Sequence, residues 1–238
     1  MYVKKGQEHR FTKPLKFVSD TQHPRKLMLT GVVMRPVGVN GSVFDGKIGL
    51  WRTGHYEIAQ KKSKNRDAGT EYFVDDTIDQ HAYFRTMENT VFPELRAAAE
   101  ILKTNKIWLQ DDNASPHKAA RKRLNELGSG YNRGAKIEMK NQSARSPDFN
   151  ALDAYVWRVL QKAVDKKMPR DDKELVEAID WAWKERLTAW HLEMAFRVIG
   201  TACRQTIECG GGNNYRLAHD GHRKAMIAEG WVQPEWCK

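Results

Sequence analysis

Short apolar runs and amphipathic segments alternate through the first two thirds of the chain, and this order limits the possible folds. Runs of strand length, some punctuated by glycines, predict strands at residues 26–36, 42–51, 106–110 and 135–139. Apolar residues at helical spacing predict helices at residues 84–102, 115–128, 152–163, 171–187 and 191–204. We therefore expect an α/β domain with a helical C-terminal third.

Local signals refine the expected helix boundaries. Pro93 should kink or divide its helix, because proline cannot donate the backbone hydrogen bond. Ser115 followed by Pro116 predicts an N-cap and a first helical position. Asp171 and Glu174 have the spacing of a capping box. Residues 60–70 are polar and basic, which predicts a loop.

Positive charge is the main compositional signal. The 238 residues include 40 Lys and Arg against 30 Asp and Glu, a net charge of +10. Basic residues gather at residues 1–26, 61–66 and 118–123. Such surfaces favour a polyanionic partner, because phosphate binding releases counterions. Charge by itself is equally compatible with two interpretations. The chain binds nucleic acid, or it has a basic surface with no specific partner.

Other classes of protein fit the composition poorly. No run approaches the about 18 apolar residues of a membrane-spanning helix, and the first residues lack the apolar core of a secretory signal. Three cysteines, Cys203, Cys209 and Cys237, lie near the C-terminus. Their odd number favours a reducing compartment over a disulfide framework. A zinc site using them with His219 and His222 is an alternative whose spacing matches no compact zinc pattern.

Two acidic residues occupy positions suited to metal-dependent phosphoryl transfer. Asp112 follows the strand predicted at residues 106–110, and Asp153 lies in the first turn of a predicted helix. Carboxylates that converge at one sheet edge can hold divalent cations beside a phosphodiester. Each residue also has a purely structural interpretation. Asp112 is compatible with a turn, and Asp153 with a favourable position at a helix N-terminus.

The surrounding motifs resemble those of mariner-like DNA transposases. The run WLQDDNASPH at residues 108–117 resembles the family pattern Q-x-D-N-A-x-x-H at the end of a strand. The run ARSPDFNALD at residues 144–153 resembles the pattern S-P-D-hydrophobic-N-x-x followed by an acid. The run CGGGNNY at residues 209–215 resembles a common C-terminal segment. The resemblance covers residues 1–220 and is strongest over residues 106–160.

The resemblance implies a ribonuclease-H-like mixed sheet flanked by helices, at residues 1–205, with a C-terminal tail at residues 206–238. It implies metal-dependent DNA cleavage and strand transfer with Mg²⁺ or Mn²⁺, on transposon ends and target DNA in the nucleus. A homodimer is compatible with this interpretation, and no membrane partner is expected. The implied catalytic metal ligands are Asp112 and Asp153, and the implied DNA contacts are Asn113, His117 and Arg145. Asp111 is the alternative ligand if the motif is shifted by one residue, and Asp148 is expected to shape its loop.

The sequence departs from the family at its start. In such enzymes the first catalytic Asp lies on a first strand just before a segment like residues 2–7, and no residue here matches it. We expect the first strand to be missing and cleavage to be impaired, because two carboxylates hold a metal pair poorly. Asp20 and Asp45 are the available substitutes, in a polar loop and a turn. The alternative function is a catalytically inactive DNA-binding transposon remnant.

Overall fold

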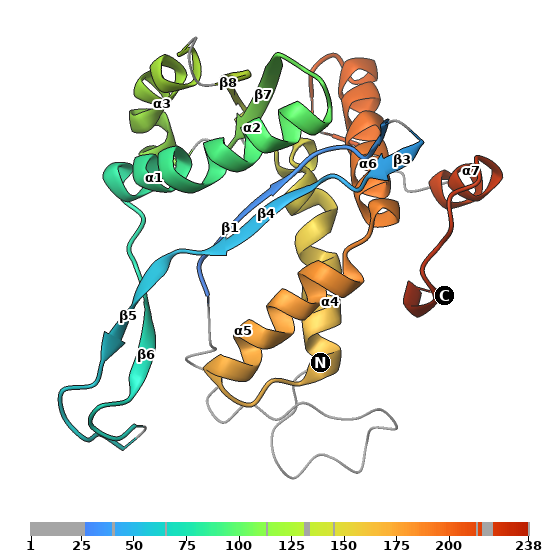
Figure 1. The fold of residues 1–238 in the computed structure, drawn as a ribbon. Helices are drawn as coiled ribbons and strands as arrows, with labels where there is room; N and C mark the ends of the chain where they lie inside the picture. The colour runs from blue at the N-terminus through green and yellow to red at the C-terminus, as the bar shows by residue number, and fades with distance from the viewer. Residues whose placement is uncertain are drawn as a thin grey trace.

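The computed structural model describes residues 27–39, 41–64, 66–112, 114–130, 134–144, 146–212, 214–215 and 221–237 (Figure 1). The basic segment at residues 1–26, which includes Asp20, lies outside these ranges. The described chain is mixed α/β, with small sheets followed by helices, as the segment order predicts.

The described strands pair two by two. Three pairs are antiparallel: β1 (Leu29–Val33) with β4 (Lys47–Arg52), β2 (Val37–Val39) with β3 (Ser42–Phe44), and β5 (Gly54–Ile58) with β6 (Glu71–Asp75). The fourth pair, β7 (Lys106–Asp111) with β8 (Lys136–Asn141), is parallel. The connection between β7 and β8 contains a helix, as a parallel pair requires.

Helices occupy the middle and the last third of the chain. The α-helices are α1 (Gln80–Thr86), α2 (Phe92–Ile101), α3 (Ser115–Gly128), α4 (Trp157–Lys167), α5 (Asp172–Trp181), α6 (Ala189–Glu208) and α7 (His222–Ala228). Wider π-helical stretches lie at Met87–Val91, Leu152–Val156 and Ala182–Arg186. Short 3-10 turns lie at Pro147–Phe149 and Glu235–Cys237. The division expected at residue 205 falls inside α6, and α7 packs against that helix through a hydrogen bond between Thr201 and His222.

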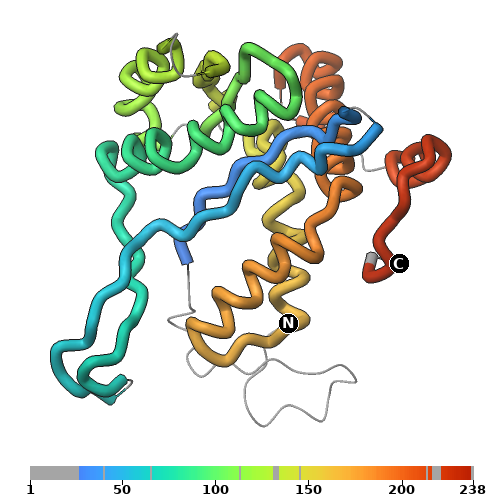
Figure 2. The backbone as a smooth tube through the Cα atoms, viewed as in Figure 1, coloured from blue at the N-terminus to red at the C-terminus, as the bar shows by residue number. Residues whose placement is uncertain are grey.

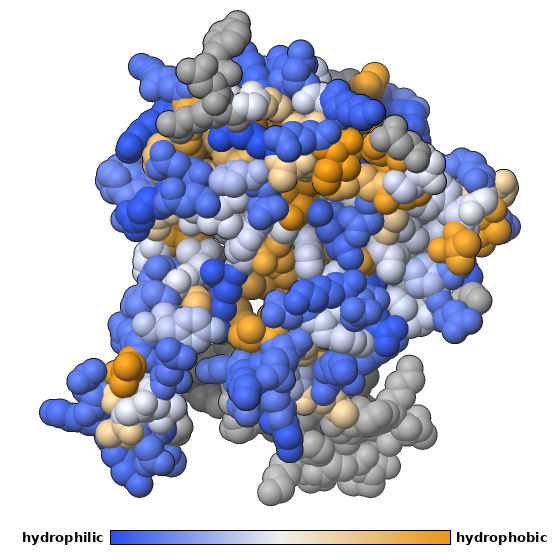
Figure 3. Space-filling model, viewed as in Figure 1, coloured by the Kyte–Doolittle hydropathy of each residue, from blue (hydrophilic) through white to orange (hydrophobic). Residues whose placement is uncertain are grey.

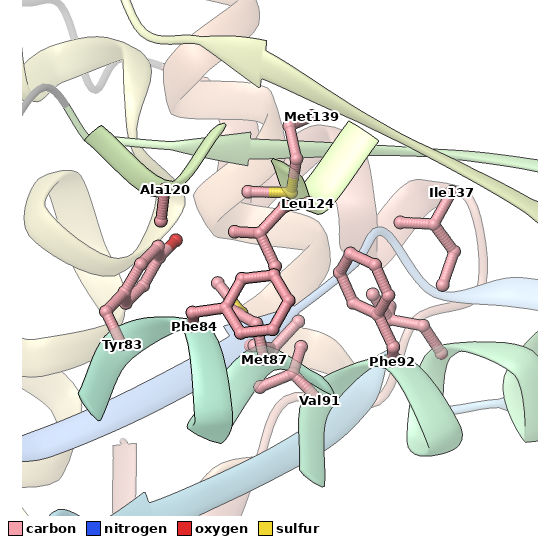
Figure 4. Close-up of a cluster of buried hydrophobic side chains, with 11 residues drawn as sticks. Tyr83, Phe84, Met87, Val91, Phe92, Ala120, Leu124, Ile137 and Met139 are labelled. Carbon is pink, nitrogen blue, oxygen red and sulfur yellow. The ribbon is translucent and has the colours of Figure 1, made fainter. Parts of the chain in front are cut away.

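Two hydrophobic clusters form the core of the described chain. The first lies between α1, α2, α3 and the β7–β8 pair, and Figure 4 shows its side chains, with Phe84, Phe92 and Leu124 among them. The second gathers the apolar faces of α4, α5 and α6. Strand β1 belongs to both, because Val32 packs in the first cluster and Val33 against the second. Successive side chains of a strand point to opposite faces, so one strand joins the two clusters.

The strand predicted at residues 42–51 is divided in two. A turn at Asp45 and Gly46 separates β3 from β4. Gly46 has φ of +87°, and a Cβ there would lie 2.3 Å from the carbonyl oxygen of Met34. Only glycine fits this position without strain, so the chain turns although the apolar pattern continues through it.

The basic loop predicted at residues 60–70 connects the two strands of a hairpin, β5 and β6. The sequence pattern does not predict these strands, although His55, Tyr56, Glu57 and Ile58 alternate between polar and apolar residues. The run is short and largely polar, so its alternation is a weak signal. Figure 2 shows the hairpin extending away from the helices.

The helix around Pro93 is divided, as predicted. The π-helical stretch at Met87–Val91 separates α1 from α2, because proline cannot donate to the preceding turn. The start of α3 differs from the prediction. Ser115 is the first residue of α3 and not its N-cap, which is Ala114. Asp112 makes the capping turn earlier, since its Oδ1 accepts the backbone N–H of Ala114 at 2.9 Å.

The Asp171 cap is confirmed in part. The Asp171 side chain accepts the backbone N–H of Glu174 at 2.8 Å, as a capping box requires. The Glu174 carboxylate accepts the N–H of Arg170, one residue before the cap, at 2.7 Å. Both the Asp171 and the Glu174 side chains therefore accept backbone N–H groups at the start of α5. The bond to Glu174 comes from Arg170 and not from the cap residue Asp171.

Candidate metal site at the ends of strands β7 and β8

The carboxyl ends of β7 and β8 meet at one edge, and the loop that follows β8 folds back against it. Asp111 and Asn141 are paired at the ends of the two parallel strands. The side chain of Gln110 donates to the carbonyl oxygen of Phe149 at 2.8 Å, and that of Gln142 donates to the carbonyl oxygen of Ser146 at 2.7 Å. These two bonds hold the turn at Pro147–Phe149 beside the strand ends.

Asp111 points into the protein. Its side chain is 5% exposed and forms an ion pair with Arg121, with Oδ1 and Nη2 2.7 Å apart. The Tyr83 hydroxyl donates to the other carboxylate oxygen at 3.3 Å. Burial raises the pKa of Asp111, and the hydrogen bond from Arg121 opposes this rise. Asp111 is thus engaged in an internal ion pair.

Asp112 points to the surface, with its side chain 51% exposed. The backbone N–H of Ala114 holds its Oδ1, and Nδ1 of His117 lies 2.5 Å from the same oxygen. The His117 ring stacks on Tyr83, with centroids 3.9 Å apart. Because Tyr83 is buried, the stack fixes the position of the histidine beside Asp112.

Asp153 follows the loop that folds back against this edge. It lies in the π-helical stretch Leu152–Val156, and its Oδ2 accepts a hydrogen bond from the Asn150 side chain at 2.9 Å. Asn150 is itself held, because its Oδ1 accepts the backbone N–H of Leu152 at 3.0 Å. The carboxylate is therefore oriented by the loop that precedes it.

Asp112 influences the pKa of Asp153. Burial is the larger cause that raises this pKa, and the negative charge of Asp112 is the second. The hydrogen bond from Asn150 acts in the opposite direction. Asp112 and Asp153 are far apart in sequence, so only the tertiary fold brings their charges together. Their mutual repulsion would be relieved by a cation between them.

The remaining predicted residues have different positions. Asn113 and Arg145 lie outside the described residues. His117 contacts Asp112, as described above. Asp148 lies in the 3-10 turn at Pro147–Phe149, within the loop that it is expected to shape. Asp45 accepts the backbone N–H of Lys47 and forms an ion pair with its side chain, which places it in a turn.

The sequence does not predict that Tyr83 and Arg121 belong to this region. In the sequence Arg121 is part of a basic cluster, whereas in the structure it neutralises Asp111. The spacing of His117 and Arg121 was the available signal, because residues four apart share a helix face. The other members of the cluster have different surroundings. Lys118 and Lys122 are exposed, and the Arg123 guanidinium lies 3.9 Å from the centroid of the Phe84 ring.

The oxygen ligands at this edge suit a hard divalent cation. Mg²⁺ is commonly bound by one or two carboxylates, with water and substrate phosphates as the other ligands. Within the described ranges, no group of three or more His, Cys, Asp or Glu side chains is arranged to hold a metal. Of the alternative zinc ligands, Cys203 and Cys209 are exposed free thiols, and the His222 ring is hydrogen-bonded to Thr201. His219 and the Cys237 side chain lie outside the described part of the chain.

None of the described helices is both long enough and apolar enough to cross a lipid bilayer. No protein-family model matches the chain, and no curated protein matches it either.

Proposed function

We propose that this chain is derived from a mariner-like DNA transposase with a ribonuclease-H-like fold. The intact parent would cleave DNA and transfer strands by metal-dependent chemistry, and this activity is impaired in the present chain because only two of the motif carboxylates are matched. The single observation that supports this most is that the loop leading to Asp153 is hydrogen-bonded through Gln110 and Gln142 to the strand ends beside Asp112. The transposase-like motifs at residues 108–117 and 144–153 contribute one carboxylate each.

The proposed ligands differ in how they are held. Asp112 is oriented through its Oδ1 by the N–H of Ala114 and by His117, while Asp153 is oriented through its Oδ2 by Asn150. Each carboxylate therefore has a second oxygen that can face a shared cation. A bound Mg²⁺ or Mn²⁺ would stabilise the charge that develops on phosphate and leaving oxygens. Asp111 is the poorer ligand, because Arg121 already neutralises it.

DNA is the proposed partner because the charge of the chain complements it. The net charge is +10, and Lys118 and Lys122 are exposed on α3, the helix that begins beside Asp112. Basic side chains at that place would contact the phosphates that flank the bond to be cut. The proposed location is the nucleus, where chromosomal DNA would be the target.

Metal binding and DNA nicking test the proposal with separate measurements. We expect Mg²⁺ or Mn²⁺ to raise the melting temperature of the full chain, and Asp112→Asn to abolish that rise. Nicking of supercoiled plasmid should fall about a hundredfold or more in Asp112→Asn, since a ligand to a catalytic cation contributes several kcal/mol. Asp180→Asn, at an exposed acid on α5, is the matched control and should behave as the unmodified chain.

One observation favours the second candidate function, an inactive DNA-binding remnant. Among the described residues, no group of three or more His, Cys, Asp or Glu side chains is arranged to hold a metal ion. The remnant predicts salt-sensitive DNA binding with no nicking at any metal concentration and no effect of Asp112→Asn. A metal-dependent melting shift that persists in Asp112→Asn would contradict the proposed site.

A further inference from the structure

The β5–β6 hairpin, here called the arm (residues 54–75), is a narrow two-stranded ribbon. Five residue pairs join its strands, from Gly54 with Asp75 to Ile58 with Glu71. A strand of five residues is about 17 Å long. Figures 1 and 2 show the arm reaching outward from the base of the helical body, with the connection between its strands at the far end.

Side-chain contacts stiffen the arm along its length. The Tyr56 and Phe73 rings meet edge to face with centroids 5.0 Å apart, and the Arg52 guanidinium lies 3.8 Å from the Phe73 centroid. Arg52 also forms an ion pair with Asp75 at the base, with a distance of 3.0 Å between Nε and Oδ1. The arm is thus held to β4 by an ion pair and an aromatic contact, which favours a fixed direction.

One face of the arm exposes apolar side chains. Tyr56 and Ile58 are 65% and 58% exposed, and both lie on the same side because they are two residues apart in a strand. The exposed Glu71, the cross-strand partner of Ile58, lies on the same face. Figure 3 shows apolar surface on the projecting arm among hydrophilic residues. Large apolar side chains on a projecting ribbon are a common feature of contact surfaces.

The far end of the arm carries the basic cluster. Lys61, Lys62 and Lys64 are all exposed. Lys62 lies 2.9 Å from Asp67 in an exposed ion pair, and the Arg66 guanidinium stacks on Tyr72 at 3.6 Å from the ring centroid. The cations therefore project beyond the apolar face, on the part of the arm farthest from the helices.

We propose that the arm inserts into the major groove of duplex DNA, with Tyr56 and Ile58 toward the base edges and the terminal lysines on the phosphates. The major groove, about 12 Å wide, admits a two-stranded β-ribbon. Residues 61–67 at the tip carry four basic side chains and one acid. This local charge favours DNA over a second copy of this chain, because a second copy would bring an equally basic tip. The inference rests on the proposed function only in taking DNA as the partner.

Binding of the full chain to a duplex of about 30 base pairs, measured in EDTA at several salt concentrations, tests the arm without the metal site. We expect the triple variant Lys61→Ala, Lys62→Ala and Lys64→Ala to reduce the slope of log K against log salt by about 0.9 for each phosphate that is no longer neutralised. Its affinity near 0.1 M salt should fall on the order of tenfold or more. Tyr56→Ala with Ile58→Ser should weaken binding while leaving the salt slope unchanged.

The matched control removes three exposed lysines on α4, α5 and α7: Lys162→Ala, Lys173→Ala and Lys224→Ala. It removes the same amount of charge and should retain the salt slope. Unchanged affinity and slope in the arm variant would overturn the proposal, even if the chain nicks DNA. The proposal would also be overturned if the Tyr56→Ala with Ile58→Ser variant bound DNA normally but changed its oligomeric state. That result would assign this face to contact with a second copy of the chain. Arm-dependent binding without nicking would support the arm and refute the enzyme.

Discussion

Asp111 and Asp112 are adjacent acids whose environments differ because successive side chains at a strand end point to opposite sides. Asp111 faces the first hydrophobic cluster and is neutralised by Arg121. Asp112 faces solvent and acts electrostatically on Asp153. Whether Asp111 or Asp112 is the motif acid therefore depends on which side of β7 each carboxylate occupies. The structure gives the accessible position to Asp112.

The ion pair between Asp111 and Arg121 makes a prediction about stability. Arg121→Met should lower the free energy of unfolding by about 3 kcal/mol, because it leaves a buried carboxylate without its partner. Urea denaturation at neutral pH measures this decrease. The double variant Asp111→Asn with Arg121→Met should regain most of it, because no buried charge remains. A decrease below about 1 kcal/mol in the single variant would show that the pair contributes little.

Helix α3 and strand β8 make a close backbone approach at a glycine. A Cβ on Gly128 would lie 2.1 Å from the carbonyl oxygen of Ile137, which is a backbone atom and cannot rotate away. Asn125 on the same helix accepts the backbone N–H of Met139 at 2.7 Å, so the helix is also hydrogen-bonded to the strand. These contacts set the position of α3, and with it the position of His117 relative to Asp112.

Substitutions at two glycines compare the close contact between α3 and β8 with a helical position that has free space around it. Gly128→Ala should destabilise the chain by about 2 kcal/mol or more, because the helix must move away from β8. Gly200→Ala in α6 should be neutral or stabilising by up to about 1 kcal/mol, since its nearest neighbour is the flexible end of Arg204 at 3.9 Å. Thermal and urea unfolding provide both values. Equal effects at the two positions would mean that α3 does not depend on the close approach.

At the scale of the whole molecule, β1 joins the two hydrophobic clusters, and α6 carries buried groups of the second. His191 near the start of α6 is buried, its Nδ1 accepts the backbone N–H of Thr188, and its ring stacks near Trp236. Burial lowers the pKa of His191 from 6.5 to about 4. The folded chain therefore holds this histidine neutral at pH values where the unfolded chain protonates it.

The lowered pKa predicts how global stability depends on pH. The contribution of His191 is fully present above about pH 6.5 and decreases as the pH falls toward about 4, because protons bind preferentially to the unfolded chain. The decrease amounts to about 3 kcal/mol. His191→Gln can retain the capping bond without the titration, so its unfolding free energy should fall less over the same range. Parallel pH dependences for the two proteins would contradict the assignment.

Local features of this protein follow from its sequence. The apolar run at residues 106–110 predicts β7, the spacing after residue 152 predicts the C-terminal helices, and the two motifs place Asp112 and Asp153 at element ends. These features depend on neighbours within a turn or a strand, so periodicity and motif spacing are sufficient. Such signals do not predict the β5–β6 hairpin, because its polar and apolar residues alternate over only a few positions. They do not predict the π-helical stretches either, because the residue spacing there is nearly that of an α-helix.

Only the tertiary structure decided which acid meets which partner. Arg121 reaches Asp111 because α3 packs on the first cluster. Asp112 acts electrostatically on Asp153 because Gln110 and Gln142 hold the returning loop against the strand ends. A sequence pattern specifies the face of its own element, but not the element that this face will meet. Contacts between distant residues are selected by the burial of the whole core, and the arrangement of charges at the candidate site follows from that packing.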